Sequence, residues 1–575
     1  MPAPSTSAGP DLGEHLIAAA RAQRAVVLTG QNTIDLFQAP DGNFLYITEL
    51  VAVRHRQEGR LAVVASSLGF RQHNQRGETP RALHLPPVDT PTGRAMRDFT
   101  RSLAGAEPIV LILDYGDLQL PAGSASHPPT SDQQLLLETL ASFPIDPALA
   151  AHRLVVIDRT NALDPRLARL PGWHQISLDL PNEAHRQAII RRIEFRHEQD
   201  PKHSAGLEKG LSVEEFAQLT GGLTNDELKR AAMEAAESGT QLTARWAQGQ
   251  KAARIRQQAQ EGLDVVPPGR GLADIAGLPQ VRLFIRERNA RKRWPRAIVL
   301  AGPPGVGKTL VVRAIADELN WPAVSLGAFR SMWQGESERR LRNILGIIRA
   351  MAPIVVHIDE ADQALGSRGT GMTDGGTDNR ILAELWNFLG DSAPDFAALF
   401  VLTTNRPDVL DPATRSRSEI IPVLHPIGPE RGELLRLACR AEGAEVPIEA
   451  CEEAVAASGI DLFSGRMLTK AAQRADILAG IEGGDVAAHL PQALAELQER
   501  TDPINDERMS LLSVQMASFT TYLPWVASER LGQAVHLPRY IQPLLVDGAL
   551  DNQRLAARIE ELEDQATQHL LRRRA

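Results

Sequence analysis

Short apolar runs recur along the chain, and each one ends in a glycine or in polar residues. Four of these runs lie at residues 25–28, 109–113, 297–301 and 354–358. Runs of about five apolar residues without alternation are typical of strands buried on both faces of a parallel sheet. The stretch from Leu310 to Ala316, after the third run, is compatible with a helix. This alternation of buried strands and helices predicts α/β domains.

The first half of the chain repeats three features of the second half in the same order. The matching pairs are 25–30 with 297–302, 108–114 with 353–359, and Thr160-Asn161 with Thr404-Asn405. From Asp114 to Asn161 there are 47 positions in the first half, and from Asp359 to Asn405 there are 46 in the second. Chance similarity between buried strands is the alternative, but the nearly equal intervals favour a duplication. We therefore predict two α/β domains of one topology.

Composition narrows the class of protein. A chain of 575 residues with 43% hydrophobic and 23% charged residues is typical of several soluble globular domains. The net charge of −9 gives no global attraction to nucleic acid, and the basic run 286–296 is expected to be a solvated face or an interface patch. Two cysteines, no signal-like start and no apolar run of about 18 residues predict a cytoplasmic protein without a membrane span.

Residues 302–309 carry the first chemical signal. They read Gly302, Pro303, Pro304, Gly305, Val306, Gly307, Lys308 and Thr309, directly before Leu310. This is the phosphate-binding pattern G-x-x-x-x-G-K-[ST] between a strand and a helix, where backbone N–H groups surround an anion. We expect ATP as ligand, with Lys308 on the β- and γ-phosphates and the Thr309 hydroxyl on Mg²⁺. A chance Gly/Pro turn is the alternative.

Two carboxylates extend this site. Asp359 and Glu360 follow the apolar run 354–358, and Asp359 lies 51 residues after Lys308. Ligand sites of open α/β sheets lie at the carboxyl ends of the strands. We expect Asp359 to hold Mg²⁺ and Glu360 to polarise the attacking water. By itself an acidic pair after a strand is often a solvated loop, but its distance from the phosphate-binding pattern favours the catalytic interpretation.

The first half lacks these groups. Leu36 stands at the lysine position, Phe37 at the magnesium-binding threonine position, and Asp114-Tyr115 where the second half has Asp359-Glu360. Without the lysine and the acidic base, a site cannot hydrolyse a triphosphate in this way. We therefore predict two tandem P-loop-type α/β domains, of which the first is a pseudo-ATPase.

The expected layout has five parts. They are a degenerate ATPase-like domain (14–245), a linker (246–271), a large ATPase subdomain (272–435), a helical lid subdomain (436–500) and a helical C-terminal extension (501–575). The linker ends in the helix-breaking residues 267–271. In the extension, Leu555, Ile559, Leu562 and Ala566 form one helical stripe, typical of a packing or self-association helix.

Three further stretches resemble the AAA family of AAA+ ATPases. They are residues 335–338, 357–362 and 403–412, and the order and spacing of the family hold from about 272 to 475. The chain is most similar to a SpoVK-like branch, some of whose members carry a degenerate N-terminal ATPase-like domain. The resemblance implies that Asn405 is the sensor that positions the attacking water. It also implies that Asp274 and Ile275 cradle adenine, although Ala276 replaces a usual glycine.

The same resemblance implies residues that act between subunits or on a client. Arg415 and Arg417 lie where the family has its arginine fingers, in a segment (414–418) shorter than usual, so either arginine is a candidate or a plain surface residue. Arg466 resembles a second sensor at the start of the lid helix. Trp333 and Gln334 occupy the first pore-loop position, where an aromatic side chain grips an extended polypeptide; simple packing of Trp333 is the alternative. The glycine-rich segment 366–376 occupies the second.

The resulting hypothesis is an ATP-driven ring, a homo-oligomer and by family resemblance a hexamer, that remodels a protein partner. A nucleotide-switched assembly or regulatory scaffold that threads no substrate is the alternative. A nucleic-acid motor is disfavoured by the acidity of the chain and by the lack of interleaved aromatic and basic residues. The sequence has no H-E-x-x-H motif, so proteolysis would require another chain.

Overall fold

The computed structural model describes residues 23–574 apart from several short gaps. The gaps are residues 31, 40, 74–82, 124–127, 259–262, 270, 292, 327–336, 365–384, 386, 389–396, 411, 461 and 498–501. The chain forms two compact units, one ending at Ala244 and the other beginning at Arg245. Each unit has its own sheet and hydrophobic clusters, so the two are described separately.

The first unit is a helix–sheet–helix sandwich. Its six strands lie in the order β5-β4-β6-β7-β1-β8, all parallel except β5, which pairs antiparallel with β4. The strands are β1 (Ala25–Thr29), β4 (Leu61–Ser66), β5 (Gly69–Gln72), β6 (Ile109–Leu113), β7 (Arg153–Ile157) and β8 (Trp173–Ser177). Helix α2 (Ile47–Gln57) packs on one face, and α3 (Thr92–Ser102) and α5 (Ser131–Ser142) pack on the other.

Smaller elements complete the first unit. A hairpin of β2 (Leu36–Gln38) and β3 (Phe44–Tyr46) lies between β1 and α2, and α4 (Gly116–Gln119) follows β6. Three helices come after the sheet, namely α6 (Glu183–Gln199), α7 (Val213–Leu219) and α8 (Asn225–Glu237). Each begins with a capping box, so the side chains of Asn182, Ser212 and Thr224 satisfy otherwise unpaired N–H groups and fix where the helices start.

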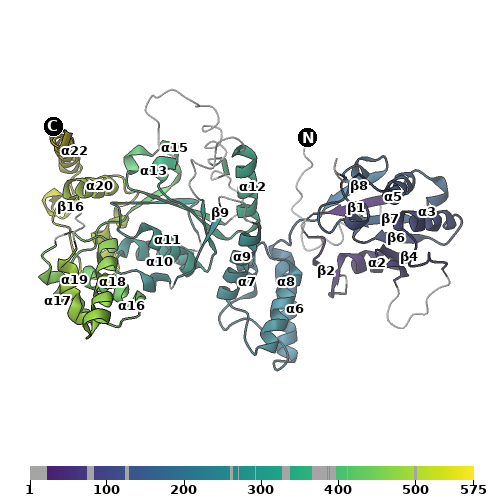
Figure 1. Ribbon diagram of the computed structural model, residues 1–575, viewed down its shortest axis with the longest axis horizontal. Coiled ribbons are helices and arrows are strands. Elements are labelled where there is room, and N and C mark those ends of the chain that lie inside the picture. Colours follow the sequence, from purple (N-terminus) through teal and green to yellow (C-terminus); the bar gives the residue numbers. More distant parts are fainter. Residues whose placement is uncertain are drawn as a thin grey trace. The chain divides into compact units, whose positions relative to one another are not determined.

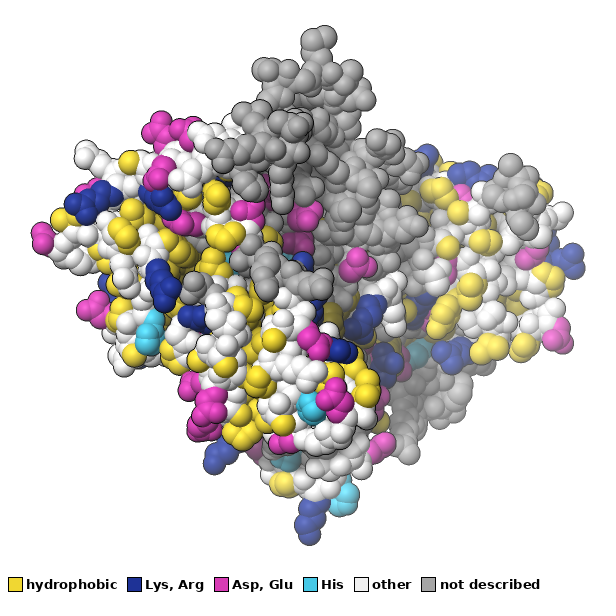
Figure 2. All heavy atoms as spheres, turned by 60° about the vertical axis from the view of Figure 1, so that its left-hand side comes forward, with side chains coloured by type: hydrophobic (Ala, Val, Ile, Leu, Met, Phe, Trp, Pro, Cys, Tyr) yellow, Lys and Arg dark blue, Asp and Glu magenta, His cyan; other side chains and the backbone are white. Residues whose placement is uncertain are grey.

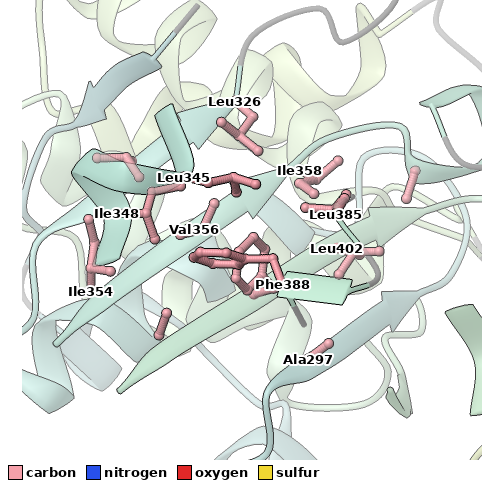
Figure 3. Packing of buried hydrophobic residues seen from close by; sticks show 14 of the residues in the cluster. Ala297, Leu326, Leu345, Ile348, Ile354, Val356, Ile358, Leu385, Phe388 and Leu402 are labelled. Carbon is pink, nitrogen blue, oxygen red and sulfur yellow. The ribbon is translucent and has the colours of Figure 1, made fainter. Parts of the chain in front are cut away.

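The second unit, whose edge strand β9 is labelled in Figure 1, is built around a sheet in the order β14-β10-β13-β12-β11-β9. Its strands are β9 (Leu263–Val266), β10 (Ala297–Ala301), β11 (Ala323–Leu326), β12 (Ile354–Ile358), β13 (Ala398–Thr404) and β14 (Glu419–Pro422). Helices α10 (Pro279–Arg291) and α11 (Lys308–Leu319) cover one face of this sheet, and α12 (Ser337–Ala350) covers the other. On the α12 face, Leu345 and Ile348 pack toward Val356 and Phe388 (Figure 3).

The two sheets confirm the predicted pair of α/β domains. Five strands follow the same spatial order, β8-β1-β7-β6-β4 in the first unit and β14-β10-β13-β12-β11 in the second. In both sheets a sixth, antiparallel strand borders the fifth, but it comes from a different place in the chain. β5 directly follows its partner β4, whereas β9 precedes the whole second sheet. The shared part is therefore the five-stranded parallel core.

Residues 246–271, which we expected to be a linker, contribute to the second unit. They contain most of α9 (Ala244–Gln258) and the edge strand β9, which pairs with β11. On α9, Ile255 is buried in the core, and the buried Lys251 donates from Nζ to the Pro353 carbonyl at 2.7 Å. This segment therefore adds a strand and core contacts to the ATPase sheet.

Helices follow the second sheet, as predicted. A lid of α16 (Glu430–Ala441), α17 (Ile448–Ala457), α18 (Gly465–Glu482) and α19 (Val486–Ala495) has its own apolar core. The C-terminal region contains α20 (Pro503–Gln515), α21 (Pro524–Arg530), a hairpin of β15 (Leu545–Val546) and β16 (Ala549–Leu550), and α22 (Asn552–Arg574). Leu555, Ile559 and Leu562 of α22 are buried in a cluster with Leu511 and Leu512 of α20, so this stripe is a packing face.

Candidate active site

The phosphate-binding pattern forms a tight loop between β10 and α11. The N–H of Gly302 donates to the Thr404 carbonyl at 3.2 Å, and a Cβ at Gly302 would overlap the Val423 carbonyl oxygen. Gly305 and Gly307 have φ angles of +78° and +92°, a region that favours glycine. The glycines are therefore required by the backbone, and they bring the chain into α11 at Lys308.

Lys308 is folded against this loop. Its Nζ donates to the carbonyls of Gly302 at 2.8 Å and Pro303 at 2.7 Å, and to Oδ1 of Asn405 at 2.8 Å. Burial lowers the pKa of Lys308 to about 8, while Asp359, Asp362 and Asp506 favour its charged form. The loop lysine and the asparagine after β13 thus lie together, although they are 97 positions apart in the chain.

The acidic pair lies at the end of β12. Asp359 Oδ1 accepts from the Glu360 N–H at 3.0 Å and from the Thr403 hydroxyl, and the Asp359 side chain is 58% exposed. Glu360 has φ of 48°, a left-handed turn that directs the chain away from the strand. Both carboxylates are solvent-accessible at the carboxyl edge of the sheet, where oxygen ligands for a hydrated Mg²⁺ are expected.

The sequence interpretation gave no role to three polar side chains around this pair. Thr403 donates to Asp359, and the buried His357 places Nε2 3.3 Å from the Thr403 hydroxyl. Burial lowers the pKa of His357, which favours its neutral form. Thr404 donates from its hydroxyl to Asp362 Oδ1 at 2.7 Å. In the sequence, the feature that could have indicated these contacts is the pair of threonines that ends the otherwise apolar β13.

The lid contacts the phosphate loop. Ser464 caps the N-terminus of α18, and a Cβ at Gly305 would lie 3.0 Å from Ser464 Cβ. The N–H of Arg466 points to the Gly305 carbonyl at 3.4 Å, so the exposed Arg466 lies beside the loop. Ile275 is buried in one cluster with Val306 of the loop, and its carbonyl accepts from Arg282 at 2.7 Å.

The other residues that we proposed from the sequence do not take part in these contacts, or they fall outside the residues that the structure describes. Thr309 and Leu310 are exposed in the first turn of α11, and Pro304 is exposed in the loop. Arg415 and Arg417 lie on α15 (Pro412–Arg417), with Arg417 exposed. The side chain of Asp274, the pore-loop residues Trp333 and Gln334, and the segment 366–376 lie outside the described residues.

The corresponding region of the first unit is built differently. Leu36 and Phe37 are buried in strand β2, and the next long helix, α2, begins only at Ile47. The first unit therefore has a hairpin where the second has a loop that leads directly into a helix.

Charged groups of the first unit pair with one another at this place. The guanidinium of Arg159 donates from Nε to Asp114 Oδ1 at 2.8 Å, from Nη2 to the Thr48 hydroxyl at 2.8 Å, and from Nη1 to the Thr33 carbonyl. The Thr48 hydroxyl donates to Asp114 Oδ2 at 2.8 Å. Asp114, the counterpart of Asp359, is thus occupied by a protein cation.

A second pair joins the hairpin region to α8. The buried Asp35 accepts from the Asp226 N–H at 2.7 Å, and Asn225 donates from its side chain to the Leu36 carbonyl at 2.9 Å. Burial raises the pKa of Asp35 to about 6, although backbone N–H groups partly compensate. A carboxylate of the chain itself therefore lies at the N-terminus of α8, where the helix dipole favours an anion.

The five-stranded core, the phosphate loop and the acidic turn define the second unit as a P-loop nucleoside-triphosphatase domain. Residues 298–424 match the model of the ATPase family associated with various cellular activities (AAA). The second unit therefore contains an AAA ATPase domain, which confirms the resemblance to the AAA family, while the SpoVK-like branch stays a prediction.

Curated relatives include two kinds of AAA protein. The chain is 29% identical over 297 residues to the cell division cycle protein 48 homolog of Archaeoglobus fulgidus, which covers 45% of this chain and 39% of that protein. It is 31% identical over 256 residues to the ATP-dependent zinc metalloprotease FtsH 2 of Salinibacter ruber, covering 41% and 37%. The same identity holds for FtsH 3 of Sphaerobacter thermophilus, covering 41% and 50%. The chain thus spans half or less of these relatives' lengths.

Clusters of metal-ligating side chains and membrane-spanning helices are both missing from the described part of the chain. Within the described ranges, no group of three or more His, Cys, Asp or Glu side chains is arranged to hold a metal ion. Among the described helices, none is long and apolar enough to cross a bilayer. The face formed by the lid and the C-terminal helices carries acidic and basic side chains intermingled (Figure 2).

Proposed function

We propose that this protein is an ATP-driven remodeller of a protein partner, with one working ATP site per chain. The observation that carries the proposal is the convergence of Lys308, Asn405 and the turn at Asp359-Glu360 beside a glycine loop that the lid contacts. Catalysis would come from positioning and electrostatic stabilisation, as is general for phosphoryl transfer.

Each residue would have a distinct role. Lys308 would exchange its carbonyl contacts for β- and γ-phosphate oxygens, and Asn405, released from the lysine, would orient the attacking water. Glu360 would polarise that water as a general base. Thr309 and Asp359 would hold Mg²⁺, which neutralises charge on the phosphates when it is bound.

The first unit would contribute structure rather than turnover. Its counterpart of the magnesium-binding aspartate is paired with Arg159, and Leu36 and Phe37 belong to its core. A nucleotide would have to displace a buried ion pair to enter, which costs several kcal/mol. We therefore retain the interpretation of the first unit as a pseudo-ATPase.

Work on a protein partner is supported by the relatives and by the family position of the pore loop. The relatives' names describe a cell-division-cycle protein and ATP-dependent proteases. A homo-oligomeric ring, by resemblance a hexamer of a SpoVK-like member, would let Arg415 or Arg417 reach a neighbour's γ-phosphate. Trp333 and Gln334 would grip the client, Arg466 would sense the nucleotide from the lid, and Asp274 and Ile275 would border the adenine.

The test uses the Glu360→Gln variant of the full chain. It should bind ATP without turnover, and it should assemble and retain its client in a pull-down with ATP but not with ADP. The matched control is Glu449→Gln, an equally conservative change at an exposed position of lid helix α17, which should behave as wild type. A monomer without a client under ATP would overturn the proposal of a remodeller.

A second variant separates the remodeller from a nucleotide-switched scaffold. Trp333→Ala should keep most of the ATPase activity and lose work on the client. If assembly and client handling are unchanged while nucleotide still controls oligomeric state, the scaffold is the correct function.

A further inference from the structure

The C-terminal region is hydrogen-bonded to the edge strand β14 of the ATPase sheet. Ser518 follows α20, and its N–H donates to the Ile420 carbonyl at 3.1 Å, while its hydroxyl accepts from the Ile420 N–H at 2.8 Å. Tyr522 donates to Glu419 Oε2 at 2.6 Å. The edge strand β14 thus obtains its outer hydrogen bonds from residues about 100 positions later in the chain.

The segment that joins β14 to the lid packs against α20, because Leu424 lies in one buried cluster with Leu511 and Leu512. The strand ends at Pro422 and the first lid helix begins at Glu430, so residues 423–429 form the hinge between sheet and lid. Within this hinge, the buried His425 places Nδ1 2.9 Å from the Phe463 carbonyl and Nε2 3.5 Å from Oδ2 of the buried Asp506 on α20. A carbonyl only accepts, so Nδ1 carries a proton, whereas Nε2 makes no hydrogen bond to a described residue and meets the Asp506 carboxylate as an ion pair only when the ring is protonated.

The partner of His425 immediately precedes the part of the lid that contacts the phosphate loop. Phe463 is followed by Ser464, the N-cap of α18, which packs against Gly305, and by Arg466, whose N–H points to the Gly305 carbonyl. Phe463 itself is fully buried in the lid core. A shift of its carbonyl would therefore move the N-terminus of α18 relative to the loop.

We propose that His425 is a positioning residue for the ATP site, which holds the N-terminus of α18 against the phosphate loop, and that the Asp506 carboxylate, 3.5 Å from Nε2, holds a protonated His425 ring from the C-terminal region. The C-terminal region is then a working part of the ATP site. This inference rests on the proposed ATPase function. It is supported by the influence of Asp506 on Lys308, because the carboxylate is one of three that favour the charged form of the lysine, against a larger effect of burial.

The experiment measures the dissociation constant of a non-hydrolysable ATP analogue, and KM and kcat for ATP, on the full chain. His425→Ala should weaken analogue binding and raise KM about tenfold, with a smaller change in kcat, because the lost hydrogen bond positions the lid in ground state and transition state alike. Asp506→Ala should act in the same direction by a smaller factor, whereas Asp506→Asn, whose amide can donate to an uncharged Nε2, should retain part of the affinity. His425→Gln, which can still donate to the Phe463 carbonyl, should recover part of the affinity.

The lid offers a matched control. His489 on α19 also hydrogen-bonds a carbonyl, that of Gly483 at 2.9 Å, and lies 4.0 Å from the Glu482 carboxylate, but it has no contact with the hinge segment 423–429 among the bonds described for it. His489→Ala should leave the affinity and KM unchanged. A double-mutant cycle adds a second control, since Asp506→Ala should have little further effect once His425 is alanine.

Several outcomes would overturn the proposal. They are an unchanged affinity in His425→Ala, an equal loss in His489→Ala, or additive losses in the double variant. If His425→Ala does not fold, the Gln and Asn variants decide the question by the same measurements. A wild-type chain that binds the analogue without hydrolysing ATP would contradict the proposed function but leave the positioning test intact, because that test is read from binding.

Discussion

The two units keep one backbone and use it for different chemistry. Both have the same five-stranded order, and the turn after the central strand is left-handed in both, with φ of 54° at Tyr115 and 48° at Glu360. Glu360 is a carboxylate in that turn, whereas Tyr115 is an aromatic side chain under the Arg159 guanidinium, 5.3 Å from its ring centroid. The comparison shows that the two units share the turn geometry, whereas the carboxylate in that turn is present in the second unit and replaced in the first.

The two units differ in the groups that hydrogen-bond their buried charged side chains. Among the residues that the structure describes, Lys308 of the second unit donates directly to carbonyl and amide oxygens alone, which a phosphate can replace. In the first unit Asp114 and Arg159 form a buried pair, and Asp35 accepts from the start of α8. Buried charges require partners, so the loss of a nucleotide site is accompanied by internal replacements for the groups that a nucleotide would contact.

The largest expected effect concerns Lys308. Lys308→Ala should abolish ATP turnover and reduce nucleotide binding to zero per chain, because the first unit offers no second site. The counterpart change Leu36→Ala should leave turnover intact and act only on stability. Calorimetric titration gives the stoichiometry, with one nucleotide per wild-type chain expected. A remaining nucleotide in Lys308→Ala would show that the two sites are less different than the comparison holds.

A smaller effect is expected from Arg159. Arg159→Ala leaves Asp114 buried without its cation and should lower the free energy of unfolding of the first unit by about 3–5 kcal/mol. The control is Arg191→Ala, which breaks a solvent-exposed pair with Glu214 and should hardly change the free energy of unfolding. Urea unfolding followed by hydrogen exchange in β6 and β7 measures both. Equal losses of unfolding free energy in the two variants would mean that the pair of Arg159 and Asp114 does not take the place of a ligand.

The smallest effect concerns Asp35, and it depends on pH. Its folded pKa of about 6 lies above the ordinary value of 3.8, so folding favours the protonated form, and the penalty appears as pH rises from about 4 to about 6. Asp35→Asn should therefore stabilise the first unit at pH 7, on the order of 2 kcal/mol, and have no benefit near pH 4.

The control for this change is a carboxylate shifted in the opposite direction. Hydrogen bonds from Asn43 lower the pKa of the exposed Asp41, so Asp41→Asn should be slightly destabilising at pH 7. Chemical denaturation of the first unit at pH 4 and pH 7 checks both variants. If Asp35→Asn destabilises the unit at pH 7, the carboxylate is held as a required anion, and the site resembles an occupied phosphate site more closely than we infer.

Local patterns in the sequence were sufficient for the duplicated α/β fold and for the regions of the site. The glycine loop and the acidic turn are contiguous segments whose chemistry depends on spacing within a few residues. Strands β10 and β12 begin and end where the apolar runs predict, and α11 contains the stretch 310–316 that was expected to be helical. The comparison of the two halves of the sequence showed that Leu36 and Phe37 stand where a nucleotide site needs a lysine and a threonine. It did not show that they form a strand, because a three-residue strand depends on its partner β3.

Sequence motifs alone therefore identify the class of the second unit and the chemical groups available to it. Which of these groups meet is visible in the folded chain alone, since the important pairs join residues far apart in the sequence. Arg159 reaches Asp114 and Thr48, β9 completes the second sheet, and His425 lies between Phe463 and Asp506. Hydrophobic periodicity specifies which face of an element is buried, but the partner of a buried polar side chain is set by the packing of all elements together.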